Sequence, residues 1–408
     1  MSASSTRPSY AAVLRMPYAT RTFTAALAAR LSYGMVSLAV MLAVSRATDS
    51  YTAAGVVVAL FGAASVFLSP LRAALVDRHG PRRALLPMAS LYAGLLGALA
   101  AVSWRPGAPV PVLAVVAVAA GACTPPIGAT MRAVWGELIT DRRLLQRAYS
   151  LDGVAEELLF VSGPLLVGLM TGFAPPAAAV AVSALLVGLG TTAFVASPAV
   201  KGVAVHVARA GARTRLGRGL VQPVVVAAGV GLSLGAVDLL VLAFAEQRHH
   251  GENAVAWVLA ALSAGSAVGG LLNGAVDWRM SARLRLPLLA VGLALALGVA
   301  GLAPGLVTLS AAVAVAGLFV APALTTSYLL ADESAPPGGR VRAGTWVNTA
   351  VNAGSSAGAA AVGLLVGRLP LAVCFAASGA VALVAALVSW HGEASPDVRT
   401  GEAAELVR

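Results

Sequence analysis

Long apolar stretches alternate with short polar turns along almost the whole chain of 408 residues. Each stretch has few charges and is about as long as an α-helix must be to cross a bilayer, roughly twenty residues. Twelve such stretches cover about residues 22–44, 52–75, 84–103, 111–134, 148–172, 175–197, 222–245, 254–276, 286–303, 307–330, 343–367 and 370–391. The pattern predicts an all-α membrane protein with twelve transmembrane helices.

The basic residues of the turns fall mainly on alternate sides of these stretches. With segment 1–21 placed in the cytoplasm, the outer turns contain only a few of them, namely Arg46, Arg105, Arg248 and Arg368. Because positively charged loops stay in the cytoplasm, this asymmetry predicts that both termini, including segment 392–408, are cytoplasmic. The first stretch is too long for a signal-peptide core, so we expect it to remain as a membrane helix.

A long basic segment over 198–221 interrupts the chain near its middle. It separates residues 22–197 from residues 222–391, and each part contains six apolar stretches. Parallel repeats of this kind build the two halves of many secondary transporters around a midplane cavity. We therefore predict two six-helix bundles joined by a solvated cytoplasmic linker, which also has the charge to contact anionic lipids.

The composition excludes several classes of protein. Hydrophobic residues make up 59% of the chain, charged residues only 11%, and the mean hydropathy is +0.85, so a soluble protein is excluded. The net charge of +11 lies in turns between apolar stretches, and no nucleic-acid-binding motif is present. Cys123 and Cys374 each lie inside an apolar stretch and predict neither a disulfide nor a metal site. No catalytic arrangement and no nucleotide-binding signature occurs, so we expect neither an enzyme nor a cofactor.

The turn over 73–83 carries the most informative motif of the chain. It follows the second apolar stretch and contains Asp77, Arg78, Gly80, Arg82 and Arg83. Asp77 can accept hydrogen bonds from a helix N-terminus, and Gly80 permits a tight turn. The turn resembles the Gly-x-x-x-Asp-Arg-x-Gly-Arg-Arg signature of the major facilitator superfamily of secondary transporters, with Ala73 for the first Gly and Pro81 at a usually basic position. The resemblance implies that this loop takes part in gating, and segment 270–279 is a degenerate copy of it at the equivalent place.

Charged residues within the apolar stretches are few, and each is a candidate functional group. They are Arg30 in the first stretch, Glu156 and Glu157 in the fifth and Asp238 in the seventh, with Asp152 near the start of the fifth. A carboxylate in an apolar cavity can bind and release a proton as access alternates, so Glu157 and Glu156 are candidates for proton coupling. The alternative is a structural ion pair with Arg30, which lies at the same depth. Asp238 either lines the outer half of a cavity or bonds to neighbouring helices.

The fifth stretch also contains Gly163, Pro164 and Gly168. Pro164 removes a backbone donor and is expected to bend the helix, and the glycines are expected to let the eighth helix come close. The segment resembles the Gly-Pro-x-x-Gly-Gly signature of the superfamily's drug–proton antiporters, although one closing Gly is missing. A structural kink without a role in coupling is the alternative.

Two further groups of polar residues are candidate binding positions. Trp346, Asn348 and Asn352 lie at helical spacing in the eleventh stretch, where they contact either the substrate or neighbouring helices. The adjacent His249 and His250 in an outer turn are poorly arranged for a metal ion, and no metal site is expected.

The resemblance, together with these patterns, implies a facilitator-type transporter, and we expect it to export a small amphipathic organic molecule in exchange for protons across a bacterial plasma membrane. The expected partners are a small-molecule substrate, protons and the lipid bilayer, with no nucleic acid, and the expected state is a monomer. A sugar or other polar metabolite is the alternative substrate. A receptor or scaffold that keeps the fold without transport is the second alternative.

Overall fold

The computed structural model describes residues 9–202, 218–249, 252–336 and 338–391. Apart from one isolated β-bridge between Val366 and Leu369, the regular elements of these ranges are helices. The first half contains α1 (Tyr10–Leu14), α2 (Ala19–Thr48), α3 (Tyr51–Phe67), α4 (Ser69–His79), α5 (Pro81–Val102), α6 (Val110–Cys123), α7 (Ile127–Leu138), α8 (Arg142–Thr171), α9 (Pro176–Ala196) and α10 (Pro198–Lys201). The second half contains α11 (Arg218–Gln247), α12 (Glu252–Ala275), α13 (Ala282–Ala300), α14 (Leu306–Ser334), α15 (Arg340–Leu365) and α16 (Leu371–His391).

Each predicted apolar stretch corresponds to one helix or to one broken pair of helices. Ten spans of the described chain are long and apolar enough to cross a membrane, with α6 and α7 counted as one, and the pair α3 and α4, bent by 43°, makes an eleventh. The remaining stretch corresponds to α15, which has 26 residues but a more polar sequence. The predicted all-α membrane fold is therefore confirmed, and two of its spans are broken near the middle.

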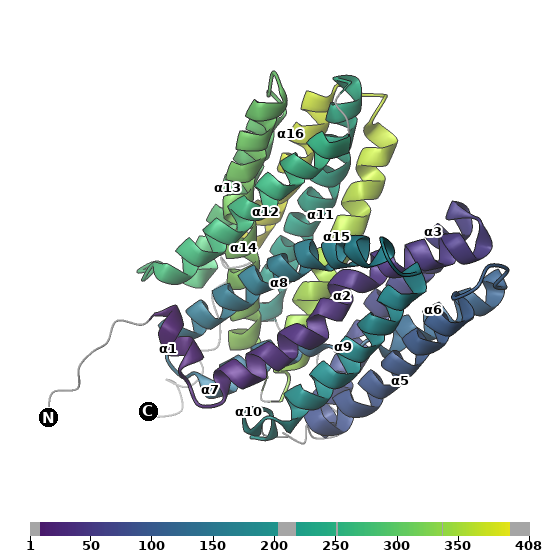
Figure 1. Ribbon diagram of the computed structural model, residues 1–408. Helices are drawn as coiled ribbons and strands as arrows, with labels where there is room; N and C mark the ends of the chain where they lie inside the picture. The colour runs from purple at the N-terminus through teal and green to yellow at the C-terminus, as the bar shows by residue number, and fades with distance from the viewer. Residues whose placement is uncertain (1–8, 203–217, 250–251, 337, 392–408) are drawn as a thin grey trace, which may run out of the picture.

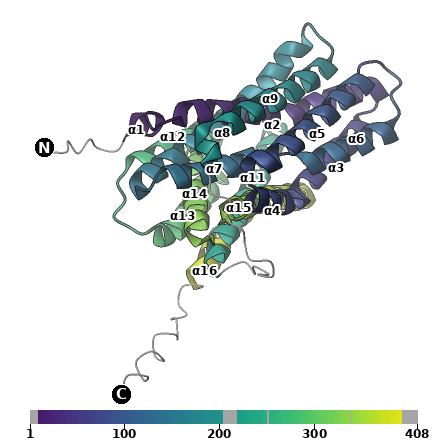
Figure 2. The ribbon, with the colours of Figure 1, turned by 90° about the horizontal axis from the view of Figure 1, so that it is seen from below.

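The helices form two groups that diverge toward one end of the molecule (Figure 1). Helices α2 to α9 make the N-terminal half and α11 to α16 make the C-terminal half, and each half has an apolar core of its own. A third core cluster contains residues of both halves and joins them. Seen from below, α4 of the first half lies beside α15 of the second (Figure 2), and the two helices are in contact. Most of the predicted linker over 198–221 lies outside the described residues.

Small residues allow close approach between helices of the same half. On α11, Gly231 and Gly235 face the backbone of Val351 and Ser355 on α15, and a Cβ at either glycine would collide with it. Such contacts hold membrane helices together by van der Waals packing, because lipid offers no hydrophobic force between them. They explain why glycine is frequent within the apolar stretches.

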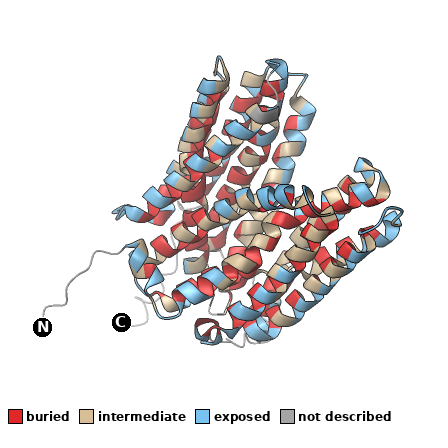
Figure 3. Ribbon diagram, in the orientation of Figure 1, coloured by how far each residue is buried: buried red, intermediate tan, exposed pale blue. Residues whose placement is uncertain are grey.

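The outer surface of the two bundles is largely apolar. Figure 3 shows buried residues inside each bundle and exposed ones around it. Leu185 and Leu189 of α9 and Leu295 and Val299 of α13 are examples of exposed large hydrophobic side chains. Exposed apolar bands of this extent are stable in lipid and unfavourable in water, so the protein is a multi-pass membrane protein.

One end of the molecule joins the two halves, and we call it the gate face. It is formed by the turns at Gly80, at 139–141, at 276–281 and at the described residues between α14 and α15. The turns at 49–50, 103–109, 172–175, 301–305 and 366–370 form the opposite end, toward which the bundles diverge (Figure 1).

Candidate substrate cavity and gate

A cavity of about 560 Å³ lies between the two halves. This size is typical of sites that enclose a small organic molecule. Helices α2, α3, α4, α5, α7 and α8 line it from the N-terminal half, and α14 and α15 supply most of the lining from the C-terminal half. Among the predicted site residues, the cavity is lined by Arg30, Glu156, Glu157, Asn348 and Asn352.

Four charged side chains of the N-terminal half form a closed cluster beside this cavity, which we call the charge quartet. Arg30 lies 2.7 Å from Asp152 and 3.0 Å from Glu156, and Arg132 lies 3.0 Å from Asp152 and also contacts Glu156. Each arginine thus has two carboxylate partners, and the cluster is formally neutral. Pairing of this kind offsets the cost of removing the four charges from water. The guanidinium carbon of Arg132 lies 3.7 Å from the ring centre of Tyr328 on α14, in the other half.

Of the charge quartet, Arg132 was not predicted, and Asp152 was noted only for its place near the start of the fifth stretch. Asp152 precedes Glu156 by four residues and therefore lies on the same face of α8. Arg132 lies within the fourth apolar stretch, and its charge there was the available signal. Only the three-dimensional structure brings Arg132 of α7 and Arg30 of α2 to the same two carboxylates.

Glu157 is not the partner of Arg30, contrary to the predicted alternative. Its Oε1 accepts a hydrogen bond of 2.9 Å from the hydroxyl of Ser266 on α12. Adjacent residues of a helix point about 100° apart, so Glu156 turns toward the arginines while Glu157 turns toward the C-terminal half. Within the described chain no cation lies at salt-bridge distance from Glu157. Glu157 is thus an acid at the interface of the two halves that no cation of the described residues neutralises.

Asp238 lies on α11 and is exposed, outside the set of residues that line the cavity. Leu234, one turn earlier on the same face of α11, does line the cavity. Asp238 therefore lies one turn further toward the open end, on the side that faces the gap between the bundles.

The predicted polar residues of α15 divide into two groups. Asn348 and Asn352 line the cavity, together with Thr345 and Thr349. Trp346 is half-buried and is not among the lining residues, because it points to another side of the helix. The amide of Asn352 donates to the backbone oxygen of Asn348 at 2.8 Å. The C-terminal wall of the cavity thus carries uncharged hydrogen-bonding groups.

Asp77 makes the contact expected of the 73–83 turn. Its carboxylate accepts hydrogen bonds from the backbone N–H groups of Val341, at 3.2 Å, and Arg342, at 3.0 Å. These groups belong to the first turn of α15, where unpaired donors and the helix dipole favour an anion. Gly80 has a φ of 81° between α4 and α5, a conformation that favours glycine. Asp77 therefore joins the two halves at the gate face.

Toward the described residues of the other half, the basic residues of the same turn make no comparable contact. Arg78, Arg82 and Arg83 are exposed at the gate face. Their position fits the charge asymmetry that orients membrane helices rather than a direct part in closing the gate.

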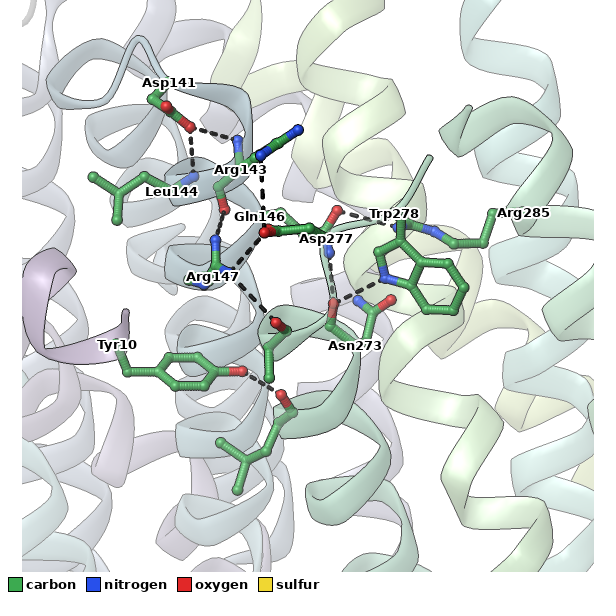
Figure 4. A network of polar contacts seen from close by, with 12 residues as sticks. Tyr10, Asp141, Arg143, Leu144, Gln146, Arg147, Asn273, Asp277, Trp278 and Arg285 are labelled. Carbon is green, nitrogen blue, oxygen red and sulfur yellow. Dashed lines mark hydrogen bonds and ion pairs between the residues drawn. The ribbon is translucent and has the colours of Figure 1, made fainter. Parts of the chain in front are cut away.

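The degenerate repeat of this turn, over 270–279, forms the second junction (Figure 4). Asp277 lies 3.0 Å from Arg147 and 3.8 Å from Arg143, both on α8 of the other half. The side-chain amide of Gln146 donates to the backbone oxygen of Asn273 at 2.5 Å, and its oxygen accepts from Arg285 at 3.1 Å. This junction uses ion pairs and amide contacts, whereas that of Asp77 uses a helix N-terminus.

The short helix α1 closes the same junction from outside. The hydroxyl of Tyr10 donates to the backbone oxygen of Leu271 on α12 at 2.5 Å (Figure 4). Burial raises the pKa of Tyr10 to about 12, so this hydroxyl remains protonated near neutral pH. Further ion pairs across the gate face join Arg142 to Glu333, at 2.9 Å, and Arg340 to Glu137, at 3.3 Å. The gate face is closed.

Arg72 holds the two broken spans together. Pro125 and Pro126 have no N–H, so the carbonyl groups of Gly121 and Ala122 have no helical partner. One terminal nitrogen of Arg72 donates to both carbonyl oxygens, at 2.7 and 3.1 Å, and the other donates to Ser65 at 2.5 Å. Arg72 is buried and lines the cavity. It supplies a charged donor to carbonyl groups at both breaks, where Gly121 otherwise accepts only from Thr124 of its own turn.

The predicted packing around Pro164 needs a correction. Helix α8 continues through Pro164 as one element. Gly163 faces the backbone of Gly34 on α2, so it allows approach of the first membrane helix rather than the eighth. Gly168 has open space beside it. The eighth helix, α12, instead contacts α8 on the side of Glu157.

The histidine pair, for which no metal site was predicted, is only partly described. His249 lies in the turn that follows α11, and His250 lies outside the described residues. Within the described ranges no group of three His, Cys, Asp or Glu side chains could hold a metal ion.

Comparison with known proteins agrees with this architecture. Among solved structures, the human organic anion transporter MFSD10 (TETRAN) superposes with a TM-score of 0.74 at 15% identity, over 94% of this chain and 100% of that chain. A bacterial homologue of the iron transporter ferroportin in an outward-facing state gives 0.74 at 12% identity, over 92% and 99%. The proton:xylose symporter XylE bound to 6-bromo-6-deoxy-D-glucose gives 0.68 at 13% identity, over 94% and 96%. These similarities are similarities of fold. No curated protein matches the chain.

The family assignment comes from the sequence itself. The family model described as Major Facilitator Superfamily matches residues 22–237 and again residues 223–406, one match for each half. Together with the two bundles, the cavity between them and the 73–83 turn, these matches cover nearly the whole chain. The protein belongs to the Major Facilitator Superfamily.

Proposed function

We propose that the protein is a proton-coupled transporter that exports a small amphipathic organic molecule by alternating access. It acts in a bacterial plasma membrane with both termini in the cytoplasm, so the gate face is the cytoplasmic one. The observation that carries this proposal is Glu157, an acid that lines the cavity at the interface of the halves and has no cation partner among the described residues. Such a group can gain and lose a proton without breaking an ion pair.

The lining of the cavity supports an amphipathic substrate. The N-terminal wall includes the aromatic side chains of Tyr33, Phe61 and Phe160, and the C-terminal wall includes Thr345 and Asn348. Aromatic and aliphatic surfaces supply most of the binding energy for a small organic ligand, while a few polar groups fix its orientation. The arginines that line the cavity are engaged by carboxylates or carbonyl groups, which leaves less charge for a strongly polar substrate.

The closed gate face supports an alternating mechanism. With this face cytoplasmic, the arrangement opens toward the outside, as does the ferroportin homologue whose described state is outward-facing. Protons then reach Glu157 from outside, the substrate enters from the cytoplasm when the gate face opens, and export follows when the cavity faces outward again. The Gly163–Pro164 segment, which resembles that of drug–proton antiporters, is consistent with export.

The test is transport into and out of proteoliposomes with an imposed proton gradient, across a panel of amphipathic drugs and sugars. Glu157→Gln should abolish gradient-driven accumulation, because the side chain can no longer change charge. Equilibrium binding of the transported compound should persist within about threefold, since the amide keeps the size and polarity of the site. Thermal stability should change little, because Glu157 has no ion pair to lose.

Glu156→Gln serves as the matched control. It changes the neighbouring residue in the same way but removes a carboxylate from the charge quartet, so it should lower thermal stability. Gradient-driven transport at the wild-type rate in Glu157→Gln would contradict the proposal. The proton site would then be Glu156 or Asp238, or transport would not be coupled to protons.

A polar metabolite is the second candidate substrate. The uncharged hydrogen-bonding groups of α15 favour it, because Thr345, Asn348 and Thr349 face the cavity together. The same panel decides between the two classes. A receptor without transport would bind a ligand from the panel but move none of them under any gradient.

A further inference from the structure

The contact of Glu157 is the innermost of a regular series between α8 and α12, which continues into the turn after α12. These antiparallel helices belong to different halves, and their contacts recur every three or four residues on each helix, as one face of an α-helix requires. The series, which we call the seam, pairs Glu157 with Ser266, Val154 with Gly270, Ser150 with Asn273 and Arg147 with Asp277. The seam leads from the cavity directly to the gate-face junction of Figure 4.

The end of the seam at the cavity depends on one hydrogen bond. Ser266 donates to Glu157 at 2.9 Å, and this is the polar contact between α8 and α12 nearest to the cavity. Farther along, Gly270 lets Val154 approach, so this part of the seam contains no polar bond. The state of Glu157 therefore sets the strength of the seam at its end beside the cavity.

The charged and titratable groups near Glu157 are engaged with other partners, and its own hydrogen bond is to Ser266. Glu156 precedes Glu157 on α8 but is engaged by Arg30 of α2 and Arg132 of α7. From α14, Tyr328 lies over Arg132. Helix α9 contains no charged residue, and α12 presents the hydroxyl of Ser266.

We propose that Ser266 is a positioning residue that converts proton binding at Glu157 into opening of the gate face. This inference rests on the proposed role of Glu157 in proton coupling. With Glu157 ionised, Ser266 holds its carboxylate and keeps the seam closed. When Glu157 takes a proton from the cavity water, the bond becomes one between neutral groups, and the seam is weaker at its inner end.

The physical basis is the difference between a charge-assisted and a neutral hydrogen bond. The charge-assisted bond is roughly twice as strong, a difference of about fivefold in an equilibrium constant. By linkage, the factor by which proton binding favours gate opening equals the factor by which gate opening raises the proton affinity of Glu157. Glu157 therefore binds its proton about fivefold more weakly while Ser266 holds it than after the seam has parted.

The experiment measures gate opening as a function of pH in the full chain in nanodiscs. Spin labels at Ala196 of α9 and Arg283 of α13, both exposed near the gate face, report the distance between the halves by double electron–electron resonance. In the wild type, the open fraction should rise as pH falls. In Ser266→Ala, the open-to-closed ratio should rise more at high pH, where a charge-assisted bond is lost, than at low pH, where a neutral bond is lost, so the response to pH should shrink about fivefold.

Two further variants separate this role from a general effect of losing a buried hydroxyl. Ser266→Thr keeps the donor and should restore the response to pH. Ser233→Ala removes a buried hydroxyl that bonds to Ser378 within the C-terminal half, and should leave the response unchanged. A wild-type response in Ser266→Ala would overturn the proposal, as would an equal change in Ser233→Ala.

The outcome also separates this inference from the proposed function. If Glu157→Gln abolishes gradient-driven transport and Ser266→Ala responds to pH as the wild type does, only the role of Ser266 fails. If Glu157→Gln transports normally, the proton site itself is misplaced, and the seam then has no proton to respond to.

Discussion

At the scale of single residues, the acidic groups at the cavity are of two kinds. The charge quartet is internally neutral, and each of its members depends on the others for partners. Glu157 stands apart from it and faces a hydroxyl of the other half. A paired cluster stabilises the helices that carry it, whereas an acid without a cation partner can change its protonation at lower cost.

The neutrality of the quartet predicts the effect of removing one carboxylate. Asp152 is fully buried and contacts both Arg30 and Arg132. Asp152→Asn should destabilise the protein by about 3–5 kcal/mol, because it leaves a buried positive charge in excess. Thermal unfolding in detergent, followed by fluorescence, measures this loss.

Two comparisons make the result specific. Adding Arg30→Gln to Asp152→Asn restores neutrality and should recover part of the stability. Asp238→Asn changes an exposed acid without a described ion pair and should leave the melting temperature unchanged within error. An unchanged melting temperature in Asp152→Asn would show that the quartet does not contribute to stability.

At the scale of helices, two spans of the N-terminal half are broken at similar positions beside the cavity. One break lies between α3 and α4, and the other lies between α6 and α7, where Pro125 and Pro126 interrupt the helix. Arg72 bonds to carbonyl groups on both sides and so connects the breaks. The inner segments α4 and α7 carry Asp77 and Arg132, which links this connection to the gate and to the quartet.

The connection predicts that Arg72→Met opens both breaks. The variant keeps an unbranched side chain but leaves three carbonyl groups without their charged donor, which should cost about 3 kcal/mol or more. Amide hydrogen exchange over 119–124 and 63–68 should accelerate together. Arg78→Met, on the exposed side of the same helix, should change neither segment. Faster exchange in only one segment would mean that Arg72 does not join the two breaks.

At the scale of the whole molecule, the two halves meet by different means at the two sides of the gate face. Asp77 binds the N-terminus of α15, and Asp277 binds arginines of α8. Both carboxylates occupy related turns, so the repeat of the sequence places one acid in each junction. Opening of the gate face requires both junctions to separate.

The Asp77 junction predicts a defect of transport rather than of folding. Asp77→Asn keeps an acceptor oxygen but loses the charge that the helix N-terminus favours, an interaction of about 0.3–2 kcal/mol. Expression should remain nearly normal, while the initial rate of transport should fall about five- to tenfold as the balance shifts toward an open gate. Initial rates in proteoliposomes, normalised to protein, measure the effect.

Asp141→Asn is the matched control for this variant. Asp141 also accepts from two backbone N–H groups at a helix N-terminus, those of Arg143 and Leu144, but within its own half. Because this contact does not separate during gating, its loss should lower stability slightly and leave the rate unchanged. Transport by Asp77→Asn at the wild-type rate would exclude a gating role for Asp77.

The sequence by itself determined the features that depend on whether a segment lies in lipid or in water. Apolar stretches of bilayer length predicted the helical membrane fold, because backbone groups in lipid must be satisfied within a helix. The acidic position in the 73–83 turn predicted a contact with a helix N-terminus, since the unpaired N–H groups there favour an anion. The rarity of intramembrane charge singled out Arg30, Glu156 and Glu157 for the same reason.

Only the tertiary structure decided which of these groups meet. Arg132 and Arg30 come from different helices to the same carboxylates, and Glu157 turns away from both toward Ser266. Gly163 allows the approach of α2 rather than α12. Equal depth along two helices cannot fix a contact, because each helix can rotate about its axis, and a residue's partner depends on that rotation. Packing of whole helix faces sets the rotation, and it is a property of all the helices together.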